Sequence, residues 1–264
     1  MRSYETSEHG YDITGAGREM IAISRRKLIG SLLAIPAAAS ITSGQPDTEH
    51  KLKIVVTGGH PGDPEYACGG TVARYTDLGH HVTLLYLNKG EGGCAHRSAA
   101  ECSATRVAEA QKACEILKAQ PAFAGQIDGH ATVDPDTYDR FRKLLDAEKP
   151  DVLFTHWPID VHPDHRAISI LTYNAWLHMI TKPALYFYEV SDGEDTQMFA
   201  PTDYVDISGT EARKREACYA HASQAPDHFY PLQREITTFR GIQSGHAQAE
   251  AYIRYVKSPG GLLL

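Results

Sequence analysis

Short apolar stretches rich in β-branched residues alternate with longer segments of helical periodicity, and this alternation constrains the fold more than any other feature. The stretches at 52–57, 81–87, 151–155 and 184–190 predict buried strands. Parallel strands joined by helices need right-handed crossovers, which place helices on both faces of a sheet. The pattern therefore predicts an α/β fold, a three-layer α/β/α sandwich with a mostly parallel sheet. The helices are expected at 64–78, 98–118, 136–147, 165–180 and 210–221.

The pattern loosens after the fourth of these strands. We expect a short strand at 204–207, a loop that contains Pro226 and Pro231, and a last helix at 247–256. Neither a repeat nor a second domain boundary is visible in the sequence. Residues 46–264 are therefore expected to form a single domain.

The N-terminal segment has the pattern of an export signal. Arg25 and Arg26 precede an apolar run at 28–39 that ends in three alanines, which is typical of a twin-arginine signal. We therefore predict that residues 1–45 are a signal and linker and that the protein is periplasmic or extracellular. An amphipathic anchor or a buried helix is the alternative, and the run is too short to span a bilayer. The true start, Met1 or Met20, stays open.

The charge and the cysteines exclude several classes of function. A formal net charge of −7 argues against nucleic acid or anionic lipid as a partner, because phosphate binding needs clustered Lys and Arg. A neutral or cationic small molecule fits better. Five cysteines without a C-x-x-C pair exclude a thiolate zinc site and a thioredoxin motif. Whether Cys94 and Cys102 form a disulfide after export is left open.

Two polar motifs each follow one of the predicted strands. The first runs from His60 to Glu65, and the second runs from His162 to His165, about a hundred residues later. Ligand sites of α/β proteins lie at the carboxyl ends of parallel strands. We therefore expect the two motifs to meet in space.

These motifs hold the donor set of a metal-dependent hydrolase. His60, Asp63 and His165 provide the three ligands of a catalytic zinc, which keeps a fourth position open for water. Two histidines and a carboxylate also suit Fe(II), so the metal is not fixed. Four ionisable side chains between Asp160 and His165 are costly to place together unless they bind a cation or move protons. A nucleotide-binding loop and a serine-hydrolase elbow lack their glycine patterns in this chain.

Together, the segments 59–65, 69–71, 88–91 and 162–165 resemble the PIG-L (LmbE-like) family of zinc-dependent N-deacetylases. The likeness extends from about residue 52 to residue 255. It implies a Rossmann-like sandwich that carries one zinc ion. It also implies hydrolysis of an acetamido group, commonly on an N-acetylglucosamine unit, by a water that the zinc activates.

The resemblance also implies roles for individual residues. His60 and Asp63 match the first two zinc ligands, and His165 matches the third. His162 matches the histidine that steadies the tetrahedral intermediate or protonates the leaving amine, and Asp164 would orient it. The positions that match residues facing the substrate are Glu91, Arg106 and Asp128.

Gly62 departs from the family pattern. The family usually has an aspartate there, which acts as general base on the water, and such a base contributes about 10² to 10⁴ in rate. Asp160 is our first choice for a replacement, followed by Glu65 and Glu91. The alternative is a catalytically impaired protein that binds sugar or metal without turnover. The exact substrate, a small amino sugar in either case, and the oligomeric state cannot be read from the sequence.

Overall fold

The computed structural model describes residues 50–191 and 193–264. The predicted export signal lies outside the described residues. One sheet has the strand order β3-β2-β1-β4-β5-β7-β6, and the first five of these strands are parallel. The strands are β1 (Lys53–Gly58), β2 (His81–Tyr86), β3 (Gln120–Phe123), β4 (Val152–His156), β5 (Ala184–Tyr188), β6 (Asp203–Asp206) and β7 (Ala249–Arg254).

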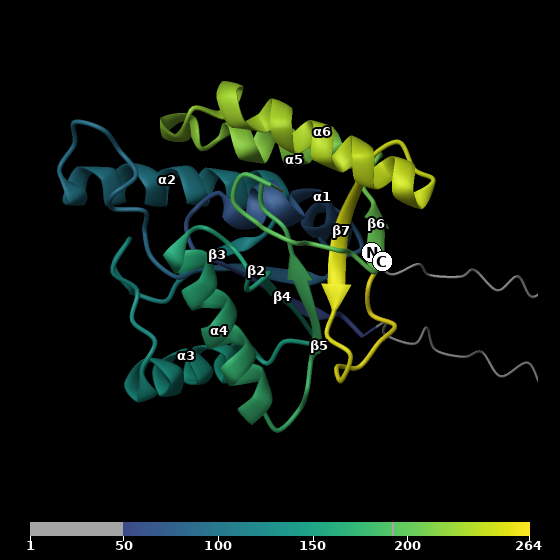
Figure 1. The fold of residues 1–264 in the computed structure, drawn as a ribbon, viewed down its shortest axis with the longest axis horizontal. Coiled ribbons are helices and arrows are strands. Elements are labelled where there is room, and N and C mark those ends of the chain that lie inside the picture. The colour runs from purple at the N-terminus through teal and green to yellow at the C-terminus, as the bar shows by residue number, and fades with distance from the viewer. Residues whose placement is uncertain (1–49, 192) are drawn as a thin grey trace, which may run out of the picture. The chain divides into compact units, whose positions relative to one another are not determined.

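Helices cover both faces of the sheet, as Figure 1 shows: α1, α2, α5 and α6 lie on one side, and α3 and α4 lie on the other. The predicted three-layer sandwich with a mostly parallel sheet is therefore confirmed. Among the described residues, no helix is long and apolar enough to cross a membrane. The helices are α1 (Asp63–Asp77), α2 (Ala99–Leu117), α3 (Pro135–Glu148), α4 (Pro163–His178), α5 (Glu211–Tyr219) and α6 (Pro226–Ser244).

Two apolar cores, one on each face of the sheet, hold the layers together. Tyr75 of α1 and Phe154 of β4 belong to the core under α1, α2 and α5. Leu171 of α4 and Leu185 of β5 belong to the core under α3 and α4. Each fully buried side chain of this size contributes about 1.5–3 kcal/mol relative to an exposed one. The sheet is thus a rigid platform for the loops at its carboxyl edge.

The C-terminal third differs from the prediction. The segment around Pro226 and Pro231 is the helix α6. Pro226 sits in the first turn, where a missing N–H costs no hydrogen bond, and Pro231 lies inside the helix. The predicted last helix at 247–256 is the strand β7, which pairs antiparallel with both β5 and β6. Ala and Glu favour a helix by intrinsic propensity, and burial on both faces of the sheet overrides that preference. Strand β3 was not predicted.

The sheet topology places the two motifs side by side. Strand β1 pairs with β2 on one side and with β4 on the other, so the direction of winding reverses between β1 and β4. A ligand crevice forms at such a switch point, outside the carboxyl ends of the strands. The first motif follows β1 and the second follows β4.

Candidate active site

A pocket of about 520 Å³ opens at the carboxyl edge of the sheet, a volume in the range of small-molecule sites. Six of the nine residues expected in the site line it, whereas Glu91, Asp160 and Asp164 do not. The expected residues that line the pocket are His60, Asp63, Arg106, Asp128, His162 and His165.

Asp63 is the centre of the candidate metal site. It opens α1, where the helix dipole favours a carboxylate. Its Oδ2 atom accepts the backbone N–H of His60 at 2.8 Å and lies 3.3 Å from His60 Nδ1 and 3.2 Å from His165 Nε2. Burial alone would raise the pKa of Asp63, but the charges of His165 and His60 outweigh burial and hold that pKa well below its usual value.

His165 lies in the first turn of α4 and is held from behind by Asp160. Its Nδ1 atom is 3.1 Å from Asp160 Oδ1, which leaves Nε2 directed at Asp63. Burial lowers the pKa of His165, whereas Asp63 and Asp160 raise it, and the result is a pKa of about 9. Asp160 also accepts the backbone N–H of His162 at 2.8 Å and the hydroxyl of Thr196 at 3.2 Å.

This placement does not favour Asp160 as the replacement for the missing base. Both of its oxygens are engaged, and its side chain is not among those that line the pocket. A carboxylate on the second nitrogen of a ligating histidine orients the ring and raises its basicity. Asp160 is placed for that orienting role toward His165.

His60 is held by two carboxylates on its other nitrogen. His60 Nε2 lies 3.2 Å from Asp128 Oδ1 and 3.2 Å from Asp164 Oδ2. Burial lowers the pKa of His60, but Asp63 and these two carboxylates raise it well above its usual value. The hydrogen bond from His60 in turn lowers the pKa of Asp128 to about 2. Asp164 Oδ2 also accepts the backbone N–H of Gly129 at 2.8 Å.

His162 is the N-cap of α4 and faces the same pocket. Its Nδ1 atom accepts the backbone N–H of Asp164 at 3.2 Å, so the neutral ring carries its proton on Nε2. Its ring centroid lies 4.6 Å from that of His60 and 4.8 Å from that of His165. The Asp164 carboxylate was expected to orient His162, but its Oδ2 atom bonds His60 and the backbone of Gly129. The backbone N–H of Asp164 holds His162 instead.

The donors present fit a divalent cation. Among the residues that the structure describes, three overlapping groups have possible ligand atoms within 4.8 Å of one another, and His60 and His165 each belong to two of them. The charges of His60 and His165 offset the surrounding carboxylates, and a divalent cation can replace those protons. Asp164 Oδ1 is buried without a hydrogen-bond partner, which leaves spare acceptor capacity at the site. The groups are His60, His162 and His165; Asp63, His156 and His165; and His60, Asp128 and Asp164.

Sequence reasoning missed several residues at this site, among them His156, Asp195 and His221. His156 was not among the expected site residues; it is fully buried at the end of β4, accepts the backbone N–H of Gly59 at 3.2 Å and stacks on His165 with ring centroids 4.2 Å apart. Burial and the charge of His165 lower the pKa of His156 to about 4, so it is neutral. Asp195 lines the pocket, and partial burial raises its pKa to about 6. His156 directly follows a predicted strand, which was a usable signal, whereas nothing near Asp195 marked it.

The rim of the pocket is a glycine-rich turn closed over Arg106. A Cβ atom on Gly90 would lie 2.7 Å from the guanidinium carbon of Arg106, so the close approach requires glycine. Arg106 donates to the backbone carbonyl of Pro61 and lines the pocket. Glu91 accepts the backbone N–H of Lys89 at 3.2 Å and supports the turn from outside.

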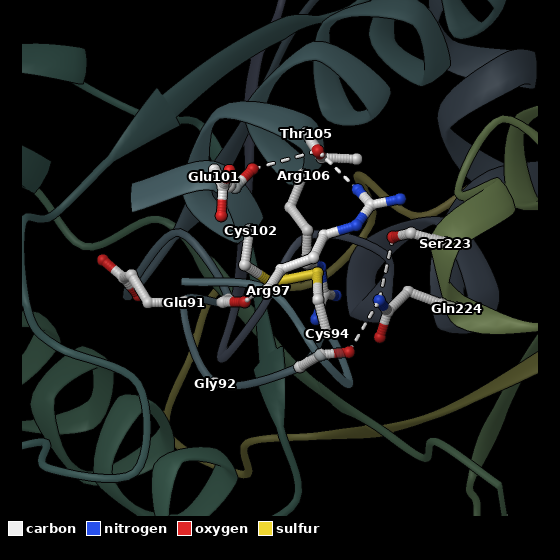
Figure 2. Close-up of a disulfide and its surroundings, with 12 residues drawn as sticks. Glu91, Gly92, Cys94, Arg97, Glu101, Cys102, Thr105, Arg106, Ser223 and Gln224 are labelled. Atoms are coloured by element: carbon white, nitrogen blue, oxygen red, sulfur yellow. Dashed lines mark hydrogen bonds between the residues drawn. A yellow bond between two sulfur atoms is a disulfide. The ribbon is translucent and has the colours of Figure 1, made fainter. Parts of the chain in front are cut away.

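A disulfide fastens this rim to α2. Cys94 and Cys102 are joined, which answers the question that the sequence left open. Figure 2 shows the bridge beside Arg106 and Gln224. Gln224 donates to the backbone carbonyl of Gly93 at 3.2 Å, so both the bridge and Gln224 hold the turn.

Comparisons with known proteins agree with this site. The family model PIG-L, described as GlcNAc-PI de-N-acetylase, matches residues 55–176. The chain is 28% identical to a diacetylchitobiose deacetylase of Thermococcus kodakarensis over 77% of this chain and 83% of that protein. It is also similar to the structure of N,N'-diacetylchitobiose deacetylase from Pyrococcus horikoshii, with a TM-score of 0.70, 22% identity, and coverage of 77% of this chain and 84% of that one.

The fold is also that of an enzyme with other chemistry. The structure of GalB, the 4-carboxy-2-hydroxymuconate hydratase from Pseudomonas putida, matches with a TM-score of 0.71 and 21% identity, over 81% of this chain and all of that one. Fold likeness by itself therefore does not select the reaction. The family model covers both motifs of the candidate site, from β1 through α4. Residues 55–176 of this chain form a PIG-L family domain.

Proposed function

We propose that this protein is a metal-dependent hydrolase that removes the acetyl group from an N-acetylated amino sugar or a related acetamido substrate. The observation that carries the proposal is the convergence of His60, Asp63 and His165 in the lining of the pocket, with His60 Nδ1 and His165 Nε2 3.2–3.3 Å from Asp63 Oδ2. Deacetylation of amino sugars is also the activity named for the relative from Thermococcus.

His60, Asp63 and His165 are the residues that would hold the ion, and zinc is the metal that we propose. Such an ion supplies a Lewis acid for the acetamide carbonyl and for the attacking water. Asp160 fixes the ring of His165, and Asp164 with Asp128 fixes the ring of His60. Partners of this kind hold the donors in one geometry, which supports metal affinity.

His162 is placed to stabilise the charge that develops during the reaction. Its Nδ1 atom is occupied by the backbone of Asp164, so Nε2–H is the atom that can donate. A fixed donor aimed at a developing oxyanion contributes about 2.7–4 kcal/mol to catalysis. Of the two roles expected for His162, this geometry favours stabilising the oxyanion over protonating the amine.

The rest of the pocket suits a sugar ring. Arg106 and Asp128 offer charged hydrogen-bonding groups, and Phe229 adds an apolar side chain to the lining of the pocket. We therefore propose that the substrate is an amino sugar of one or two units.

A binding protein without turnover is the second candidate. Gly62 favours it, because no side chain at this position can accept the proton of the attacking water. Loss of a general base costs about 10² to 10⁴ in rate. Metal and sugar binding do not need that base.

Assays of amine release separate the two candidates. The purified protein would be loaded with Zn²⁺ and offered N-acetylglucosamine, diacetylchitobiose and longer N-acetylated oligosaccharides. We expect amine and acetate in equal amounts, loss of both after chelation, and no turnover by His165→Ala. Saturable sugar binding without any amine release would contradict the hydrolase and leave the binding protein.

We also propose that residues 1–45 direct the protein out of the cytoplasm. The twin arginines Arg25 and Arg26 and the apolar run after them support this. Replacing both arginines with lysine is expected to leave the precursor in the cytoplasm, as fractionation and immunoblotting would measure. Unchanged export of the double variant would contradict the twin-arginine assignment.

A further inference from the structure

The ring of His221 lies next to Gly62. Gly62 lines the pocket at the N-cap of α1, with a φ of 113°. Apart from the residues on either side of Gly62 in the chain, the described atoms within 4 Å of a Cβ built on Gly62 are Cδ2 and Cγ of His221, each at 3.9 Å. The position from which the family's aspartate would project therefore adjoins the ring of His221.

His221 is held in one orientation by Glu65. His221 Nε2 lies 2.9 Å from Glu65 Oε1, and both side chains are fully buried. Glu65 also accepts the hydroxyl of Tyr86 at 2.7 Å and the backbone N–H of Gly62 at 3.2 Å. Because Glu65 accepts on every contact, the proton of the His221 ring lies on Nε2. One carboxylate thus fixes both His221 and Gly62.

The second nitrogen of His221 has no partner. His221 lines the pocket, and its Nδ1 atom is buried without a hydrogen bond. An unpaired buried acceptor costs about 1–3 kcal/mol. A histidine with one nitrogen on a carboxylate and a lone pair on the other is the arrangement of a general base.

We propose that Nδ1 of His221, oriented by Glu65, is the general base of this protein in place of the carboxylate that is absent at Gly62. The inference rests on the proposed function. His221 takes one proton from the attacking water, whose oxygen forms a bond to the acetamide carbon. The carbonyl electron pair moves to its oxygen, which receives a hydrogen bond from His162 Nε2–H. The C–N bond then breaks, and His221 returns the proton to the leaving nitrogen. The products are acetic acid and the free amine.

Other carboxylates are placed less well for this role. Asp160 has both oxygens engaged behind His165. Asp195 lines the pocket, but none of its atoms is within 4 Å of the Cβ position at Gly62, where the nearest atoms beyond the adjacent residues are two ring carbons of His221. Asp195 is therefore the competing candidate in the test, and Asp195→Asn is the variant that represents it.

His221→Gln is the decisive variant, because it keeps a donor toward Glu65 and lacks a base. We expect kcat to fall by about 10² to 10⁴, with KM, Zn²⁺ affinity and sugar binding each within about threefold of the parent protein. Ser223→Ala, in the same turn, is the matched control and is expected to keep full activity. In His221→Gly, added imidazole is expected to restore part of the lost turnover, which a purely structural role would not allow.

A measurement on the parent protein is independent of turnover and of variant folding. Nitrogen-15 NMR of labelled histidine should show His221 protonated on Nε2 and unprotonated on Nδ1. A proton on Nδ1 would overturn the assignment. Full activity of His221→Gln would overturn it as well, as would a loss of kcat in Asp195→Asn with none in His221→Gln. No turnover by the parent protein on any acetamido substrate would remove the proposed function and this inference together.

Discussion

Two buried clusters of charged residues contact helix α1, and they differ in how completely their atoms are paired. The Glu250 cluster, formed by Glu250, Lys214 and Tyr252, adjoins the middle of the helix. Glu250 accepts Lys214 Nζ at 2.6 Å, the Tyr252 hydroxyl at 3.1 Å, and two backbone N–H groups of α1 at 2.8 and 2.9 Å. No side-chain atom of this cluster is left without a partner.

The His60 cluster, formed by His60, Asp63, Asp164 and His165, lies at the N-terminal end of the same helix. Asp164 Oδ1 has no hydrogen-bond partner there, and His156 Nδ1 beside the cluster has none either. The charged groups of the Glu250 cluster are fully paired with one another, whereas the His60 cluster keeps hydrogen-bond acceptors that have no partner. Full pairing is what stability requires, and spare capacity is what a ligand requires. The comparison predicts that variants in the two clusters fail in different ways.

The largest effect on stability is expected in the Glu250 cluster. Lys214→Met leaves the Glu250 carboxylate buried without its cation and should lower the free energy of unfolding by about 3–5 kcal/mol. Urea denaturation measures this. The double variant with Glu250→Gln should recover part of the loss. The folded fraction of Lys214→Met should keep its Zn²⁺ affinity. A large loss of affinity would contradict the claim that the Glu250 cluster serves stability and not metal binding.

The His60 cluster should instead show itself in the pH dependence of stability. The pKa of His165 is raised to about 9, so without metal its contribution is full below about pH 6.5 and is lost as the pH rises toward 9. The contribution of Asp128, with a pKa of about 2, is lost only as the pH falls from about 4 toward 2. Both together change the free energy of unfolding by a few kcal/mol.

Melting temperatures of the metal-free protein between pH 5 and 9 test this. The metal-free protein should melt at lower temperature at pH 9 than at pH 6. Zn²⁺ should raise the melting temperature more at pH 8 than at pH 6, because a cation competes with these protons. Equal stabilisation by Zn²⁺ at both values would contradict the exchange of protons for metal.

A smaller effect separates an orienting residue from a base. Asp160→Asn should weaken Zn²⁺ binding about 10- to 100-fold, because the carboxylate holds the ring of His165. Turnover at saturating Zn²⁺ should stay within about tenfold of the parent protein. Calorimetry and amine release at several Zn²⁺ concentrations measure the two. A kcat that stays a hundredfold low at saturating metal would return Asp160 to the role of base.

The smallest effect is expected at the rim. Cys94 and Cys102 are separated by eight positions, and a bridge that closes so short a loop contributes about 2.5 kcal/mol in the chain-entropy estimate. Replacing both with serine should raise KM for the sugar and leave Zn²⁺ affinity unchanged. Ser208→Ala, at an exposed position just after β6, serves as a surface control. A change in metal affinity would mean that the rim also shapes the His60 cluster.

The meeting of the two motifs was predictable from sequence, because parallel strands bring His60 and His165 to one edge of the sheet. The roles of neighbouring residues were not. Asp160 and Asp164 are close in sequence to His162, but their carboxylates bond His165 and His60. Glu65 and His221 are 156 positions apart, and only the packing of α5 on α1 brings them together. Strand β7 was predicted as a helix because its alanines favour helices, whereas its burial within the sheet decides the actual structure.

The disulfide at the rim makes the structure of the pocket depend on the redox conditions that the protein has met. Thiols stay reduced in a cytosol of ordinary redox potential, so the bond between Cys94 and Cys102 forms only where the surroundings are oxidising. Protein recovered from a reducing compartment would have a complete set of metal ligands, but its glycine-rich turn would lack the disulfide to α2. Assembly of this site would then end with an oxidation step, and the compartment that supplies the oxidant would decide when the protein reaches full affinity for its sugar.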